Sequence, residues 1–212
     1  AEKIISLVEL ANKHFQALFK NDCLLPPQCK LNWALFSNRD SYNDYVFESE
    51  NMSLPWLDGF YSSRTNAVAI VMPAETSQWK IDDIQNEPDI ITCPPDTETD
   101  LAKIVHEAAH QLSFNGGLQK RGVMYPLWAS EGLAMYFERS FFTEYFAAGR
   151  YADIRRQRLE KLYRSGRLIP FEGFITKSRC DANISPKDVY AQAWGVFQFL
   201  SEYHRDSLRR YL

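Results

Sequence analysis

Residues 101–114 read LAKIVHEAAHQLSF, and this stretch decides how the rest of the chain is interpreted. Helix-compatible residues run through it without a break. Thr97 or Thr99 can cap its start and Gly116-Gly117 can end it, so the pattern predicts a helix over about 100–115. Apolar residues at helical spacing supply contacts to a core. The same stretch contains the pattern His-Glu-x-x-His at 106–110.

His106 and His110 stand one helical turn apart. Positions i and i+4 differ by about 40° of rotation and about 6 Å of rise, so both imidazoles leave the same face and can bind one metal ion. Glu107 lies about 100° around the helix from His106. There it flanks the metal without binding it and is placed to accept a proton from a water on the metal.

This pattern is a specific signal. The chain has only four His and fourteen Glu, and a random arrangement would produce it with a chance of about half a percent. The alternative interpretation is a pair of histidines whose nitrogens are hydrogen-bonded on a buried helix.

A third ligand is expected, because catalytic zinc usually takes three protein ligands and leaves the fourth position to water. Glu131 is the best candidate, in LWASEGLAMYFE on a second helix predicted from Pro126 to about Ser140. Its neighbours are apolar, so an unpaired carboxylate there would be costly and a metal ion would remove that cost. Glu138 is the competitor, and it is less favoured because it begins the polar run Glu-Arg-Ser.

The rest of the chain predicts an α+β fold with an N-terminal helix, a small mixed sheet and a mostly helical half that carries the metal helix. We expect a single zincin-like catalytic domain over 1–212, with a helix-plus-sheet subregion over 1–98 and a helical metal-binding subregion over 99–212. The expected elements are a helix over 4–19, strands over 31–36, 44–48, 57–61 and 66–72, a long polar connection over 74–99, and helices over 150–164 and 186–204.

Composition and charge exclude several classes of protein. The 212 residues are 45% hydrophobic and 14% aromatic, which is typical of a folded globular protein. With 24 Lys+Arg against 27 Asp+Glu, the chain lacks the basic field that binds nucleic acid. No apolar run approaches the roughly 20 residues that span a bilayer. The basic segment 150–167 is interpreted as a solvated face, with a docking surface for acidic partners as the alternative.

The four cysteines, at 23, 29, 93 and 180, form no CxxC pair, so a structural zinc site made of cysteines is not expected. Cys23 and Cys29 flank the loop LLPPQ and could close a small ring. An even cysteine count and Ala1 in place of Met favour an extracellular or periplasmic protein, and reduced thiols in the cytoplasm are the alternative. Disulfide pairing and oligomeric state stay open.

HEAAH, followed at about twenty residues by WASEGLAMYFE, resembles the gluzincins, zinc metallopeptidases such as thermolysin and the aminopeptidase-N family. GFYSSRTNAVAIVM at 59–72 and YAQAWGVFQFL at 190–200 are also similar to peptidase-MA-like domains. The likeness covers about residues 57–204. It implies one Zn²⁺ ion bound by His106, His110 and Glu131, with Glu107 as general base and a peptide or protein as substrate.

The resemblance also implies a donor that stabilises the oxyanion, often a Tyr well downstream of the Glu ligand. Tyr190 fits by position, and its hydroxyl could contribute about 3 kcal/mol. His204 is the alternative donor. It lies about 21 Å further along the same predicted helix, so the two cannot both reach one zinc ion. Tyr190 could instead be an aromatic packed at the start of a helix.

Two departures and two alternatives accompany this resemblance. The exopeptidase segment of the aminopeptidases is not visible before HEAAH, so endo- versus exo-cleavage stays open, as does the sequence preference. Met135 stands where thermolysin-like proteins carry an Asp that orients a His.

In related folds a strand before the metal helix pairs with substrate, so we expect the edge of strand 66–72 to line the cleft. The alternative functions are a non-catalytic zinc-containing scaffold of the cell envelope and a zinc amidase acting on a non-peptide substrate.

Overall fold

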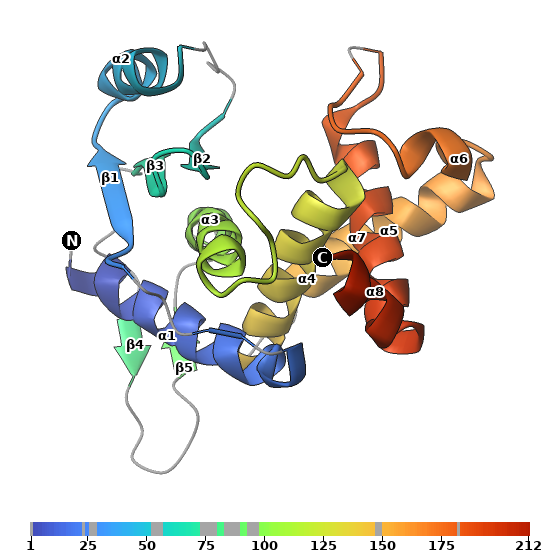
Figure 1. Ribbon diagram of the computed structural model, residues 1–212, viewed down its shortest axis with the longest axis horizontal. Coiled ribbons are helices and arrows are strands. Elements are labelled where there is room, and N and C mark those ends of the chain that lie inside the picture. The colour runs from blue at the N-terminus through green and yellow to red at the C-terminus, as the bar shows by residue number, and fades with distance from the viewer. Residues whose placement is uncertain are drawn as a thin grey trace. The chain divides into compact units, whose positions relative to one another are not determined.

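The computed structural model describes residues 2–22, 24–25, 29–51, 57–72, 80–82, 90–92, 98–146, 150–181 and 183–212. The fold is α+β, as predicted, with an N-terminal helix, a small mixed sheet and a mostly helical second half (Figure 1). The chain divides into two compact units. The first comprises Ala1–Arg121 with Tyr145–Ala147, and the second comprises Gly122–Glu144 with Ala148–Leu212.

The sheet of the first unit has three strands in the order β1-β3-β2. β1 (Asn32–Phe36) runs parallel to β3 (Ala67–Val71), and β2 (Gly59–Ser62) runs antiparallel to it. β3 is therefore paired on both sides, which suits its apolar sequence and the burial of residues 68–70. The prediction that strand 66–72 offers an edge to substrate is wrong, because the outer edges of this sheet belong to β1 and β2.

The predicted strand over 44–48 is also wrong, because these residues lie within helix α2 (Arg39–Glu50). The side chain of Asn38 caps the helix by accepting a hydrogen bond from the Ser41 backbone nitrogen at 2.9 Å. Asn51 ends it with a positive φ of 52°. The buried residues Tyr42 and Val46 are four apart, which is the spacing of one helix face and not of one strand face.

Two further helices of the first unit confirm the sequence predictions. Helix α1 (Glu2–Leu18) buries one apolar face and packs against helix α3 (Glu98–Asn115). The backbone nitrogen of Gly116 donates to Leu112 at 2.7 Å, and Gly117 has a φ of 83°, so the two glycines end α3 as expected. Thr99 lies inside α3, whereas Thr97 falls outside the described residues.

Helix α3 belongs with the sheet. It packs against β2, β3 and α1 through buried apolar residues, and Figure 1 shows it among these elements. For this reason the boundary between units follows α3, near residue 121, instead of preceding it at 98/99 as expected. Within the segment predicted as a polar connection, β4 (Lys80–Asp82) and β5 (Ile90–Thr92) form an antiparallel pair. The rest of 74–97 lies outside the described residues.

The second unit is helical. It contains most of α4 (Leu127–Tyr145), then α5 (Arg150–Arg164), α6 (Phe171–Phe174), α7 (Pro186–Tyr203) and α8 (Arg205–Tyr211). The helices predicted around 126–140, 150–164 and 186–204 are confirmed, whereas the short α6 and α8 were not predicted. α5 packs against α7.

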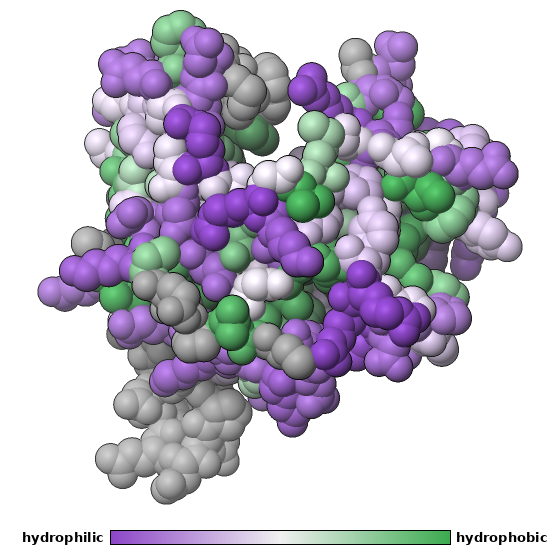
Figure 2. All heavy atoms as spheres, in the orientation of Figure 1, coloured by the Kyte–Doolittle hydropathy of each residue, from purple (hydrophilic) through white to green (hydrophobic). Residues whose placement is uncertain are grey.

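The described helices include none that is long and apolar enough to cross a membrane. The face drawn in Figure 2 carries hydrophilic and hydrophobic side chains interspersed. Cys29 and Cys180 are free, exposed thiols. Cys23 and Cys93 lie outside the described residues, and so does the suggested ring between Cys23 and Cys29.

Candidate metal centre

The two histidines of the HEAAH pattern lie side by side on α3, as helical geometry predicts. Their ring centroids are 4.9 Å apart and their planes are inclined by 81°. His110 is only 8% exposed and His106 is half-buried. The pair is therefore partly shielded from solvent, which suits a metal site that keeps one side open.

His106, His110 and Glu131 form a group that could hold a metal ion. One ligand atom from each side chain lies within 4.8 Å of the others. Ligand atoms about 2.0–2.2 Å from a tetrahedral zinc ion lie about 3.5 Å from one another. Small rotations of the three side chains would bring their ligand atoms, which lie within 4.8 Å of one another, to that spacing. Two imidazole nitrogens and one carboxylate oxygen are also a donor set that zinc takes in catalytic sites, so these residues fit the ion.

Glu131 has a well-packed setting in the second unit. The next residue, Gly132, lies against α7 so closely that a Cβ atom there would be 2.7 Å from the Ala193 carbonyl oxygen. Trp128, one turn earlier, is 6% exposed and its indole nitrogen donates to the Ile175 carbonyl at 3.0 Å. Burial raises the pKa of the Cys180 thiol, and the negative charge of Glu131 raises it further.

Glu138, the competing ligand, has a different role. It is 1% exposed, and its Oε2 forms an ion pair with Arg155 of α5 at 2.9 Å. The expectation that it begins a polar segment is wrong, because Arg155 supplies a charge that lets a carboxylate be buried there. Glu138 is not a member of the candidate metal group. Its pairing supports the choice of Glu131.

The remaining histidines also stand outside the candidate group. His14, on α1, is 9% exposed and its ring contacts Tyr145 edge-on at 5.4 Å. His204 is exposed between α7 and α8, with its ring 5.3 Å from that of Phe199. His14 and His204 therefore each lie beside an aromatic ring and do not join the candidate metal group.

Glu107 is half-buried on α3 and is not a member of the candidate ligand group, as predicted for a base beside the metal. Burial raises the pKa of Tyr42 far above its usual value, and the charge of Glu107 adds to this shift. One turn before Glu107, Lys103 forms ion pairs with Asp58 at 2.7 Å and with Asp100 at 3.1 Å.

Burial by itself would lower the pKa of Lys103, but its bonds to the two carboxylates outweigh burial and raise it. The cluster of Lys103, Asp58 and Asp100 was not predicted from the sequence, since Asp58 is 45 positions from Lys103 in the chain. The available signal was Lys103 itself, a charged residue near the start of a helix that has an apolar face.

Tyr190 lies in the second turn of α7 and is half-buried. α7 is continuous from Pro186 to Tyr203, so Tyr190 and His204 are separated by the length of the helix and cannot both reach one ion. Met135 is fully buried. Its thioether carries no charge and is only a weak hydrogen-bond acceptor, so it cannot orient a histidine as the Asp of thermolysin-like proteins does.

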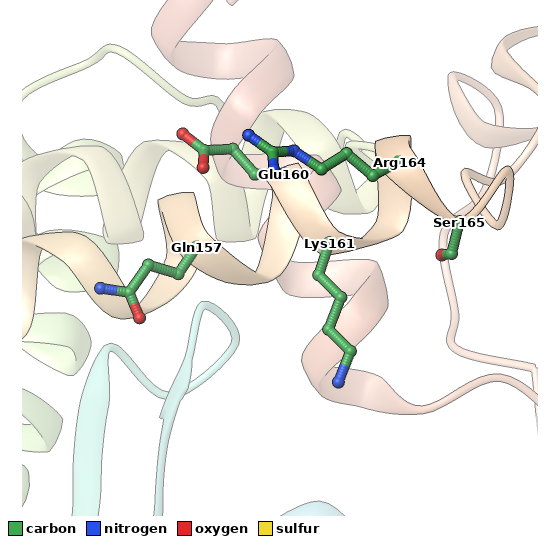
Figure 3. A pocket seen from close by; sticks show the side chains of 5 residues that line it. All are labelled: Gln157, Glu160, Lys161, Arg164 and Ser165. Carbon is green, nitrogen blue, oxygen red and sulfur yellow. The ribbon is translucent and has the colours of Figure 1, made fainter.

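A hollow of about 390 Å³ lies along α5, away from the candidate ligands. It is lined by Gln157, Glu160, Lys161, Arg164 and Ser165 (Figure 3). In Figure 3 Glu160 and Arg164 lie on one side of the helix and Lys161 points to the other, so these side chains do not converge on a ligand. Their arrangement agrees with the interpretation of 150–167 as a solvated basic face.

Comparisons with curated proteins and with solved structures give no match to this chain. Residues 100–212 match the family described as "Protein of unknown function (DUF1570)". This range is more than half of the chain and includes the HEAAH pattern, Glu131 and Tyr190. The chain therefore belongs to the DUF1570 family.

Proposed function

We propose that this protein is a zinc-dependent metallopeptidase of the gluzincin type. The observation that carries the proposal is the approach of one ligand atom each from His106, His110 and Glu131 to within 4.8 Å. Glu107 stands beside this group without belonging to it, as a general base should. A purely structural site has no use for such a base, so its presence favours an enzyme over a scaffold.

His106, His110 and Glu131 would hold the ion. When bound, zinc lowers the pKa of a coordinated water towards about 7 and polarises a carbonyl group. The protein's part is to orient the two imidazoles and the carboxylate and to leave one position open. The burial of His110 and the partial burial of His106 and Glu131 fit this, since they limit competing water.

Glu107 supplies the proton transfers. Its carboxylate accepts a proton from the attacking water as the new C–O bond forms, and it then delivers that proton to the amine nitrogen as the C–N bond breaks. Tyr190 would donate a hydrogen bond to the carbonyl oxygen as its negative charge develops, a contribution worth about 3 kcal/mol.

The substrate is a peptide or protein in extended form. β2 is the edge strand that packs on α3, and no described strand pairs with its outer edge. An extended peptide that adds to a sheet edge obtains main-chain hydrogen bonds without regard to its sequence. β2 therefore replaces strand 66–72 as the element proposed to bind substrate.

The decisive experiment compares Glu107→Gln with the wild-type protein for zinc content and for digestion of a broad peptide library. The variant should keep its zinc and lose measurable turnover, because glutamine cannot accept the proton. Glu144→Gln is the matched control, an exposed Glu on α4 that should leave both measurements unchanged. Wild-type hydrolysis by Glu107→Gln would overturn the assignment of the base.

The same measurements separate the alternatives. Zinc binding with no cleavage of any library peptide would favour the scaffold. Cleavage of non-peptide amides but not of peptides would favour the amidase. A wild-type protein that binds no zinc would contradict the peptidase, the scaffold and the amidase alike.

A further inference from the structure

Gln111, the residue after the second histidine, is a polar side chain buried in the first unit with no exposed surface. An uncharged amide in such a place is costly unless it is hydrogen-bonded. Its Oε1 accepts from the indole nitrogen of Trp33 at 2.8 Å. Its Nε2 donates to the carbonyl oxygens of Asn32 at 3.3 Å and Asn66 at 3.1 Å. Both the carbonyl oxygen and the amino group of the Gln111 amide are therefore hydrogen-bonded.

These partners belong to two neighbouring strands. Asn32 is the first residue of β1, Trp33 is the second, and Asn66 immediately precedes β3. One side chain of α3 thus binds the beginnings of two parallel strands at once. Asn115, one turn later, adds a hydrogen bond from its Nδ2 to Oδ1 of Asn66 at 2.8 Å.

These bonds restrict rotation of α3 about its own axis. The apolar contacts of the helix are not directional and tolerate small rotations, whereas hydrogen bonds weaken steeply with angle. Gln111 projects about 100° from His110 and about 140° from His106 around the helix. Holding Gln111 against the sheet therefore sets the direction in which both imidazoles and Glu107 project.

We propose that Gln111 is a positioning residue of the metal centre, which fixes the rotation of α3 and thereby aims His106 and His110. The inference rests on the proposed zinc site. Gln111 touches neither metal nor substrate in this role and acts through the helix. Its loss weakens metal binding even where α3 remains folded.

The test is Gln111→Met, which keeps the length of the side chain and removes its hydrogen bonds. Gln119→Met is the matched control, because Gln119 is also buried, at 1% exposed, but bonds to Ser113 and not to the sheet. The readouts are the Kd for Zn²⁺ from chelator competition, the visible absorption spectrum of the Co²⁺-loaded protein, and the thermal unfolding of the metal-free protein.

Gln111→Met should bind Zn²⁺ about 10- to 100-fold more weakly, the cost usual for lost outer partners of metal ligands, and should change the Co²⁺ spectrum. Gln119→Met, which loses one side-chain hydrogen bond, should lose less thermal stability and should keep its Kd within about threefold. A wild-type Kd for Gln111→Met would overturn the inference, because the amide would then support only the fold.

Trp33→Phe serves if Gln111→Met does not fold, since it removes a single bond to Oε1 and leaves the amide in place. It should weaken Zn²⁺ binding by about threefold or more, and an unchanged Kd with an unchanged Co²⁺ spectrum would overturn the inference. Failure of the wild-type protein to bind Zn²⁺ would contradict the metal site itself. Zn²⁺ binding by the wild-type protein, with an unchanged Kd in the variants, would contradict only the role of Gln111.

Discussion

Helix α3 of the first unit and helix α4 of the second carry the proposed ligands, and each is held against its own neighbours in a different way. α3 is bound to the sheet by directional hydrogen bonds, above all those of Gln111. α4 is held by close approach at Gly132 and by a buried ion pair at Glu138. Under the proposed function, a helix that presents two ligands and a base needs its rotation defined, whereas one that presents a single flexible carboxylate tolerates looser control.

The largest effect is expected from removing ligands on the two helices separately. His110→Ala and Glu131→Ala should each weaken Zn²⁺ binding by more than about 100-fold, beyond the cost of losing an outer partner. Chelator competition measures this, with His204→Ala as a control that keeps the wild-type Kd. Tight binding by Glu131→Ala would break the comparison, because α3 alone would then hold the metal.

The next effect concerns the ion pair of α4. Glu138→Gln leaves Arg155 without its carboxylate in a largely buried place and should lower the free energy of unfolding by about 3 kcal/mol. Denaturant unfolding measures this. The Kd for Zn²⁺ should stay at the wild-type value, and a large loss of zinc affinity would contradict the purely structural role of Glu138.

A smaller effect is expected at the close approach of α4 to α7. A Cβ at Gly132 would lie 2.7 Å from Ala193 O and 2.8 Å from Phe197 Cβ, so Gly132→Ala should cost about 2 kcal/mol through overpacking. Gly173→Ala is the control, since nothing lies within 4 Å of a Cβ there. Equal stabilities of the two variants would show that α4 is not held by this contact.

The smallest effect is expected at the ion pair of Asp58 with Lys103, near the start of α3, and it depends on pH. Burial by itself would raise the pKa of Asp58, but its bonds with Lys103 and Arg39 lower it below the ordinary 3.8. A lowered pKa contributes stability that is present above pH 3.8 and is lost as the pH falls through the folded-state value.

Asp58→Asn should therefore be less stable than wild type near neutral pH by about 1 kcal/mol or less, because the pair is partly exposed. The difference should shrink below about pH 3.8. Unfolding curves at several pH values measure it. A difference that grows in acid would contradict the ion-pair explanation.

The local parts of the fold were predictable because they follow from neighbours in the chain. The course of α3 and the shared face of its histidines depend only on helical repeat and on the glycines that follow. The strand expected at 44–48 is wrong because the aromatic residues there favour a strand, whereas the spacing of Tyr42 and Val46 and the caps at Asn38 and Asn51 favour the helix that forms. In that segment the helical signals were present in the sequence.

Other features depend on partners that are distant in the chain. The central place of β3 follows from pairing with β1 and β2, and the burial of Glu138 follows from Arg155. The bonds of Gln111 reach strands about 45 and 79 positions away. None of these could be read from local pattern, since long-range pairing is set by the whole fold.

By itself the sequence determined which donor groups α3 presents together, since two imidazoles and a carboxylate at 106, 107 and 110 must share one side of any helix built there. Only the tertiary structure decided that Glu138 is committed to an ion pair, because Arg155 lies beside its buried carboxylate. It also decided how α3 is held, because hydrogen bonds between distant segments form only when the sheet and the helix have packed together.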